Sequence, residues 1–238
     1  MINMRLLFTL FTLLSAGCST THSYEVSQHG GMRDTLRMGK TQPRISFAEV
    51  VSKPHAYAVG ALANLDGEIT IFDGTVYTAT TQDGTTAITA VADDTYDAAT
   101  LLTLAHVESW QNCMLPSNHP LEKAIELAAI IQGIDTETPF PFLITGSTND
   151  FQMHVINGFC PVANPNLAAK FQPWRLVGSQ STPITVVGFY AKNKEGVMTH
   201  HGSNLHIHGV IDQNGTITTG HLDSIEINSD ATLFLPIV

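Results

Sequence analysis

Runs of β-forming residues separated by Asp-Gly or Asn-Gly pairs constrain the fold of this chain more than any other feature of its sequence. Asp-Gly pairs stand at 66–67, 73–74 and 83–84, within a stretch from residue 56 to 91 that is rich in Val, Ile, Thr and Tyr. An Asn-Gly pair at 214–215 lies between two further runs of this kind. Such pairs favour tight turns between antiparallel strands. The sequence therefore predicts a hairpin meander in its first half and another hairpin near its end.

Two segments carry helix signals among these strands. The segment "SFAEVVSKP" begins with Ser46, and Glu49 follows at the capping-box spacing. The segment "PLEKAIELAAIIQG", residues 120–133, has apolar side chains at helical spacing between a Pro and a Gly. Many strands with few helices predict an α+β fold with mixed or antiparallel sheets. A weak similarity between residues 60–74 and 208–222 leaves open a duplicated architecture with two subdomains.

The N-terminal residues have the pattern of an export signal. An early cation, Arg5, precedes an apolar run from Leu6 to Leu14 that is too short to span a bilayer as a mature helix. The run "LLSAGCS" resembles the lipobox of bacterial lipoproteins, in which the cysteine, here Cys18, is lipidated and becomes the mature N-terminus. The alternative is an ordinary signal peptide in which the cysteine has no role.

This pattern divides the chain into a signal peptide over 1–17, a lipid-anchored tether over 18–31 and one folded domain over 32–238. We expect the domain to be exported and anchored to a bacterial membrane, facing the periplasm or the cell exterior. In such an oxidising compartment Cys113 and Cys160 could form a disulfide, although two buried thiols are the alternative.

The charge balance limits the partners of the domain. The chain has 21 acidic and 11 basic residues, which give a formal net charge of -10. A surface of this sign disfavours nucleic acid and anionic lipid as partners bound through a basic face. Small molecules and metal ions are the expected ligands.

The Asn-Gly turn determines which histidines of the last hairpin meet. A two-residue turn at 214–215 places His208 opposite His221, with His206 diagonal to His221 on the same face and Asp223 opposite His206. Cross-strand neighbours lie about 5 Å apart and diagonal ones about 7–8 Å apart, so three imidazoles can converge on one ion. Three histidines with open positions favour zinc or another first-row divalent metal. The alternative is an exposed strand on which the histidines are solvated.

The motifs resemble those of the α-acetolactate decarboxylase family over residues 24–227. The segment "ISFAEVVSKPHAYAVGALANLDGEITIFDGTVY" resembles a family segment that contains an L-D-G-E core, and "VVGFYAKNKEGVMTHHGSNLHIHGVI", followed later by "GH", resembles its G-F, H-x-H and G-H pattern. The resemblance implies decarboxylation of 2-acetolactate to acetoin and carbon dioxide. It implies His206, His208 and His221 as ligands of Zn²⁺ or a similar metal, and Glu68 as the catalytic proton carrier. The expected partner is a small 2-hydroxy-3-oxo acid, and a homodimer is left open.

One departure from the family pattern concerns its substrate-facing arginine. The position of this arginine falls on His154 in "FLITGSTNDFQMHVI". An imidazole is shorter than a guanidinium, lacks its bidentate fork and carries charge only when protonated. The chain also ends without the C-terminal tail that brings a further carboxylate toward the metal. Two hypotheses follow: an active decarboxylase, which the presence of Glu68 favours, and an exported module that binds metal or an oxo-acid without catalysis, which the missing arginine favours.

Overall fold

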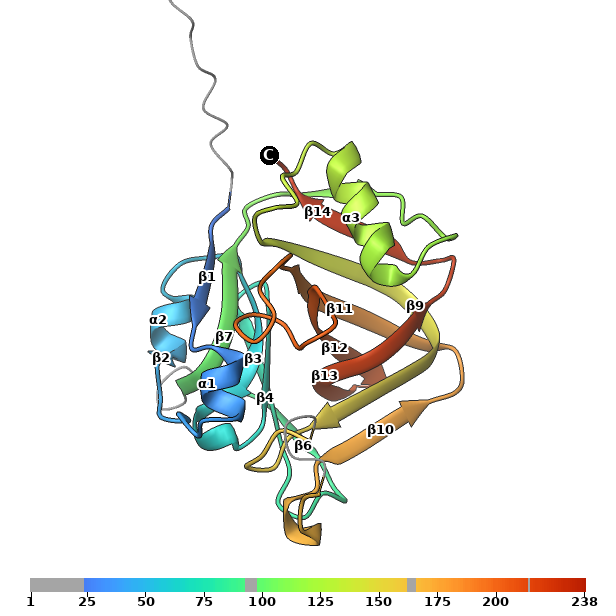
Figure 1. Ribbon diagram of the computed structural model, residues 1–238. Coiled ribbons are helices and arrows are strands. Elements are labelled where there is room, and N and C mark those ends of the chain that lie inside the picture. The colour runs from blue at the N-terminus through green and yellow to red at the C-terminus, as the bar shows by residue number, and fades with distance from the viewer. Residues whose placement is uncertain (1–23, 93–97, 162–165, 214) are drawn as a thin grey trace, which may run out of the picture.

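The computed structural model consists mainly of two antiparallel seven-stranded sheets that pack against each other (Figure 1). It describes residues 24–92, 98–161, 166–213 and 215–238. The fold class predicted from the sequence, α+β with antiparallel sheets and few helices, is confirmed.

The first sheet contains the predicted meander. Four of its strands follow one another in the chain and pair as antiparallel neighbours: β3 (Ala56–Leu62), β4 (Glu68–Phe72), β5 (Thr75–Thr80) and β6 (Ile88–Val91). On the other side of β3 lie β7 (Ala98–His106), β1 (Val26–His29) and the short β2 (Ile45–Ser46).

The second sheet contains a ring of four strands, two of which form the C-terminal hairpin. The ring consists of β9 (Phe140–Val155), β11 (Thr182–Tyr190), β12 (Leu205–Gln213) and β13 (Thr216–Ile227). Its members pair in the order β11-β12-β13-β9, and β9 also pairs with β11. The remaining strands are β8 (Trp110–Cys113), β10 (Trp174–Gly178) and β14 (Thr232–Pro236). The two hairpins that resemble each other in sequence therefore lie in different sheets.

The two predicted helices are present. The α2 helix (Phe47–Val51) has Ser46 as its N-cap, and the Oγ of Ser46 accepts a hydrogen bond from the Glu49 amide at 3.2 Å. The α3 helix (Leu121–Ile131) begins after Pro120, as its sequence predicted. The sequence did not predict α1 (Met32–Leu36), which has too few turns for a periodic pattern. Two short 3₁₀ segments, η1 (Ala63–Leu65) and η2 (Ala169–Phe171), complete the described elements.

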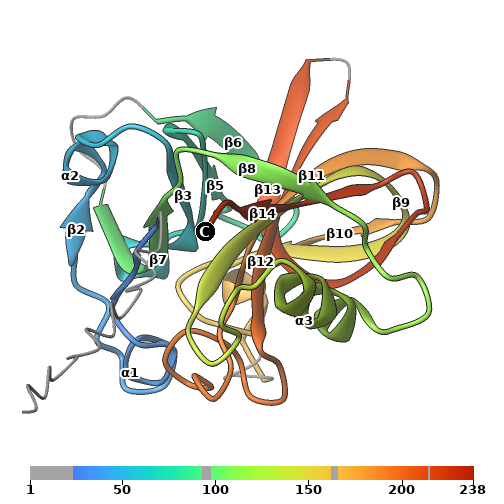
Figure 2. The same cartoon turned by 90° about the horizontal axis from the view of Figure 1, so that it is seen from above.

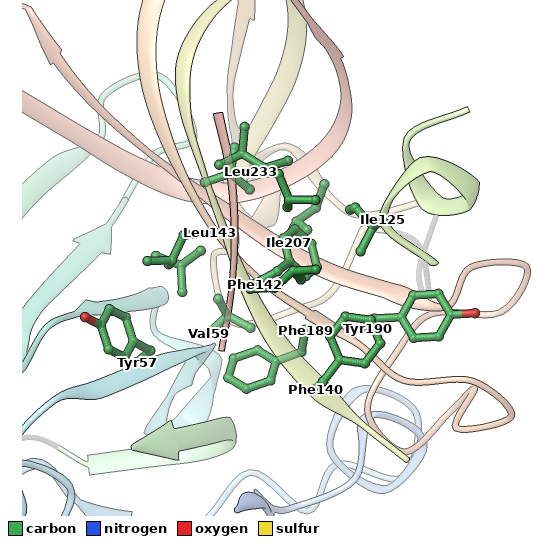
Figure 3. Packing of buried hydrophobic residues seen from close by; sticks show 14 of the residues in the cluster. Tyr57, Val59, Ile125, Phe140, Phe142, Leu143, Phe189, Tyr190, Ile207 and Leu233 are labelled. Atoms are coloured by element: carbon green, nitrogen blue, oxygen red, sulfur yellow. The ribbon is translucent and has the colours of Figure 1, made fainter. Parts of the chain in front are cut away.

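A shared apolar core joins the two sheets. Tyr57 and Val59 of β3 belong to the same buried cluster as Phe142 and Leu143 of β9, and Figure 3 shows these side chains converging from both sides. Because one core is made from both sheets, the residues between the sheets occupy fixed positions. The candidate site lies at this boundary, where β4 faces β12 and β13 (Figure 1).

Several predictions concern the ends of the domain and its cysteines. The signal peptide over 1–17 and Cys18 lie outside the described residues. The β1 strand falls inside the range 18–31 predicted as a tether, and it pairs with β7. Cys113 and Cys160 are both buried, and no disulfide joins them. Within the described part of the chain, no helix has the length and apolar character needed to cross a membrane.

Candidate metal centre

The hairpin of β12 and β13 has the register predicted from its Asn-Gly pair. Gln213 pairs with Thr216 across the turn, and His208 lies opposite His221. The Gly215 amide donates a hydrogen bond to Asp212 Oδ1 at 2.8 Å and closes the turn. Since side chains alternate between faces along a strand, this register turns His208 and His221 toward the same side.

The three predicted histidines form one buried cluster. His206, His208 and His221 each offer a ring nitrogen, and these atoms all lie within 4.8 Å of one another. The side chains are buried, so the alternative of a solvated strand is wrong. Two ring nitrogens, His206 Nδ1 and His208 Nε2, have no hydrogen-bond partner among the described residues. Buried nitrogens without partners are costly unless they bind something, so the cluster could hold a metal ion.

A chain of hydrogen bonds sets the tautomer of His208. Thr219 Oγ1 donates to the Gly209 carbonyl at 2.8 Å, so it can only accept from Thr70 Oγ1, which lies 2.7 Å away. Thr70 therefore accepts from His208 Nδ1, at 3.2 Å. The proton of the neutral ring is on Nδ1, and the lone pair of Nε2 is left for a ligand. Metal-binding histidines commonly use the second nitrogen in this way.

Burial keeps all three imidazoles neutral. Desolvation lowers the pKa of His206 to about 3, and the neighbouring His200 adds to this effect. Desolvation also lowers the pKa of His208 and that of His221 well below the ordinary value, with the neighbouring histidines adding to both shifts. The neutral imidazole is the form that binds a metal.

Glu68 faces this cluster from the other sheet. It is the first residue of β4, and its Oε2 lies 3.7 Å from His208 Nε2. Its Oε1 lies 3.8 Å from His154 Nε2. Burial raises the pKa of Glu68 to about 8, the charge of Asp223 adds to this, and a hydrogen bond from the Ile156 backbone opposes it. Glu68 can therefore carry a proton near neutral pH, as a general acid must.

His154 lies beside the cluster on β9, directly opposite His221. The ring centroids of these two histidines are 5.0 Å apart. His154 Nδ1 lies 3.0 Å from Asp223 Oδ1, and Arg175 Nη1 donates to Asp223 Oδ2 at 3.2 Å. The pKa of Asp223 is raised by burial but lowered more by its hydrogen bond with His154 and by nearby positive charge, and the net shift is downward.

One predicted neighbour is placed differently. The register predicted that Asp223 would lie opposite His206, but the described pairing of β12 and β13 ends at His208 and His221. An irregularity between Leu222 and Ser224 shifts the pairing of β13 with β9. Asp223 is therefore directed to His154. A β-bulge re-aims a side chain in this way, and the turn motif alone cannot reveal it.

The sequence reasoning missed His200, Thr70 and Thr219 as members of the site. The His200 ring is 5.3 Å from the His221 ring, and burial lowers its pKa, with His154 adding to the shift. His200 lies in the loop between β11 and β12, where no periodicity could place it. The threonines had a usable signal, because Thr70 is two residues after Glu68 and Thr219 two before His221, which puts each on the same strand face as its neighbour.

A small space of about 20 Å³ adjoins Glu68, His154, His206 and His221. The α1 helix forms part of its wall, because Met32 and Leu36 belong to its lining. A space of roughly 10–15 Å³ accommodates one water, so this space has the size of a small group beside an ion. No lysine or arginine is among the described residues that line it.

Solved structures share this arrangement of elements. No family model and no curated protein sequence matches the chain. The structure of α-acetolactate decarboxylase from Bacillus subtilis strain 168 superposes with a TM-score of 0.65 at 18% identity, over 88% of this chain and 83% of that chain. The chain has an acetolactate decarboxylase-like fold. The enzyme from Bacillus subtilis subspecies spizizenii gives a TM-score of 0.63 at 17% identity, over 89% of this chain and 85% of that one.

A further structure with this fold is a protein of unknown function from Staphylococcus aureus, described as similar to α-acetolactate decarboxylase. It superposes with a TM-score of 0.59 at 16% identity, over 88% of this chain and 84% of that chain. The distant relationship predicted from the two sequence motifs is thus supported at the level of the acetolactate decarboxylase-like fold.

Proposed function

We propose that this protein catalyses the metal-dependent decarboxylation of 2-acetolactate, or of a related 2-hydroxy-3-oxo acid, to acetoin or its homologue and carbon dioxide. The observation that carries the proposal is the position of Glu68, a buried carboxyl group with a raised pKa, 3.7 Å from a cluster of three neutral histidines. The same fold is found in two acetolactate decarboxylases from Bacillus subtilis.

His206, His208 and His221 would hold Zn²⁺ or another first-row divalent ion, because they offer neutral nitrogens and leave further coordination positions open. When bound, the ion supplies Lewis acidity for the oxygens of the substrate. The hydrogen bonds of Thr70 and Thr219 keep the proton of His208 on Nδ1, so the lone pair of Nε2 is available for binding.

Glu68 is proposed as the proton carrier. Loss of carbon dioxide breaks one carbon–carbon bond and leaves its electron pair on the substrate, which must then gain a proton. Protonated Glu68 gives that proton to the substrate carbon and regains one from solvent. His154 lies within 3.8 Å of Glu68 Oε1 and orients the carboxyl group, while its own ring is held by Asp223. The apolar side chains of Met32 and Leu36 from α1 form part of the wall and would limit the number of waters beside Glu68.

Incubation of the purified, zinc-loaded protein with racemic acetolactate tests the proposal. We expect acetoin to form faster than by spontaneous decarboxylation, and chelation of the metal to return the rate to that background. The apo protein and zinc alone are the matched controls. A rate equal to the zinc control at every pH from 5 to 8 would exclude the decarboxylase.

A second candidate is a binding module that retains the metal but not catalysis. It is favoured by His154, which stands at the position of the family's arginine and engages Asp223 at 3.0 Å. The two candidates differ in one readout, since a binding module would take up zinc and still form no acetoin above background.

We further propose that the protein is exported and anchored through lipid on Cys18. The apolar run, the "LLSAGCS" segment and the net charge of -10, which disfavours attachment to anionic lipid through a basic face, support this proposal. Replacement of Cys18 by Ser should release the protein from membranes, because a covalent lipid would be its main attachment. Undiminished membrane retention of that variant would argue against lipidation.

A further inference from the structure

A pocket of about 70 Å³ lies next to the small space beside the histidines. Four residues line both spaces: Met32, Leu36, Cys160 and His200. The larger pocket, here termed the mouth, therefore adjoins the candidate metal centre. Its lining also includes two arginines of one short segment, Arg33 and Arg37.

The position of Arg33 is determined by main-chain bonds. The Met32 amide donates to the Val197 carbonyl at 3.1 Å, and the Arg33 amide donates to the Gly196 carbonyl at 2.8 Å. These bonds attach α1 to the loop between β11 and β12, and Figures 1 and 2 both show the two segments side by side. A Cβ added to Gly196 would lie 3.3 Å from Arg33 Nη2, so the guanidinium lies against this glycine.

The two guanidinium groups are available for an anion. Among the described residues, neither Arg33 nor Arg37 has a carboxylate within ion-pair distance or a side-chain hydrogen bond. By contrast, Arg175 is bound to Asp223, and Arg44 donates to the Lys40 carbonyl. In a chain with a net charge of -10, two arginines without acidic partners at one pocket should attract an anion to that pocket.

The two spaces suit different chemical groups of one ligand. The inner space contains metal-binding nitrogens and a carboxyl group but no lysine or arginine among its described lining, and it is too small for more than a few atoms. When the vicinal oxygens of a substrate face the metal-binding nitrogens, the described lining of the inner space offers no lysine or arginine to its carboxylate. We propose that Arg33 and Arg37 form an anion subsite at the mouth, which binds the carboxylate of a substrate whose vicinal oxygens face the histidines.

This subsite rests on the proposed function and deepens it, because it assigns the recognition of the acid to α1 instead of β9. Arginine suits this role, since its planar fork can bind a carboxylate through two parallel hydrogen bonds. His200 lies between the two spaces and would contact the ligand at their junction.

A matched pair of unreactive ligands tests the subsite without any turnover. 2,3-Dihydroxy-2-methylbutanoate has the vicinal oxygens and the carboxylate but cannot lose carbon dioxide as the oxo acid does. 2-Methylbutane-2,3-diol is the same molecule with a methyl group in place of the carboxylate. Calorimetric titration of the zinc-loaded protein should give tighter binding of the acid than of the diol, and this preference should weaken with salt.

We expect Arg33→Gln and Arg37→Gln each to weaken binding of the acid by about tenfold, because each removes a charge-assisted hydrogen bond. Neither variant should change binding of the diol or the zinc content. Arg33→Lys should recover part of the affinity, since it restores charge without the fork. Arg44→Gln is the matched control, because Arg44 is exposed and does not line either space.

The outcomes separate this inference from the proposed function. Equal affinity of the acid in both arginine variants and the wild type, or no preference for the acid over the diol, would overturn the subsite even if acetolactate is decarboxylated. Arginine-dependent binding of the acid without acetoin formation would support the subsite and reject the decarboxylase.

Discussion

The two sheets contribute different chemistry to the same small space. The second sheet supplies the nitrogen donors, His206, His208 and His221, from one hairpin. The first sheet supplies oxygen groups from β4, the Glu68 carboxyl and the Thr70 hydroxyl. We infer that metal binding depends mainly on the second sheet and proton transfer on the first. Substitutions in the two sheets should therefore affect separate measurements.

The largest expected effect concerns the histidine hairpin. Replacement of His208 by Ala removes one of three nitrogen donors, so bound zinc should fall from near one ion per chain to well below half. Zinc content after gel filtration is the measurement, and His206→Ala and His221→Ala should behave alike. The exposed His119→Ala is the control and should keep its zinc. Full zinc occupancy in all three hairpin variants would reject this site.

The sequence predicted this hairpin well because its rule is local. A two-residue turn sets the register, and the register alone brings His208 opposite His221. The contribution of Glu68 from the other sheet could not be derived from spacing and depended on family resemblance. The sequence did not reveal that α1 borders the site, because α1 is attached by main-chain bonds to Gly196 and Val197, more than a hundred residues later in the chain. No side-chain pattern marks such bonds.

The next effect tests the first sheet. Glu68→Gln retains the shape of the side chain and removes its titrating proton, so the rate of acetoin formation should fall by about 10² to 10⁴ while zinc content is unchanged. Comparison of kcat with zinc occupancy separates the two contributions. A variant with normal zinc and normal turnover would remove Glu68 from the mechanism.

Thr70 tests whether the division between sheets is complete, because this first-sheet residue contacts a histidine of the second. Thr70→Val is nearly isosteric, but it removes the acceptor of the His208 Nδ1 proton. We expect zinc affinity to weaken by about 10- to 100-fold, the usual effect of losing an outer hydrogen-bond partner. Competition with a chromophoric chelator measures it, and Thr70→Ser should restore most of the affinity. Equal affinity in the Val variant would mean that the hydroxyl does not orient the ring.

The smallest and most gradual effect is the pH dependence of the metal-free protein, in which the two sheets should have opposite signs. The folded pKa of His206 is lowered to about 3, so below about pH 6.5 the unfolded chain binds more protons and stability falls as the pH falls. The folded pKa of Glu68 is raised to about 8, so between about pH 4.5 and 8 the folded chain holds the extra proton and stability falls as the pH rises. Each group contributes at most about 1.4 kcal/mol per pH unit.

Urea unfolding between pH 5 and 8 with a chelator present measures these slopes. The free energy of unfolding should fall less steeply toward acidic pH in His206→Gln, and less steeply toward alkaline pH in Glu68→Gln. Slopes that change in the same direction in both variants would contradict the opposite protonation of the two sides of the site.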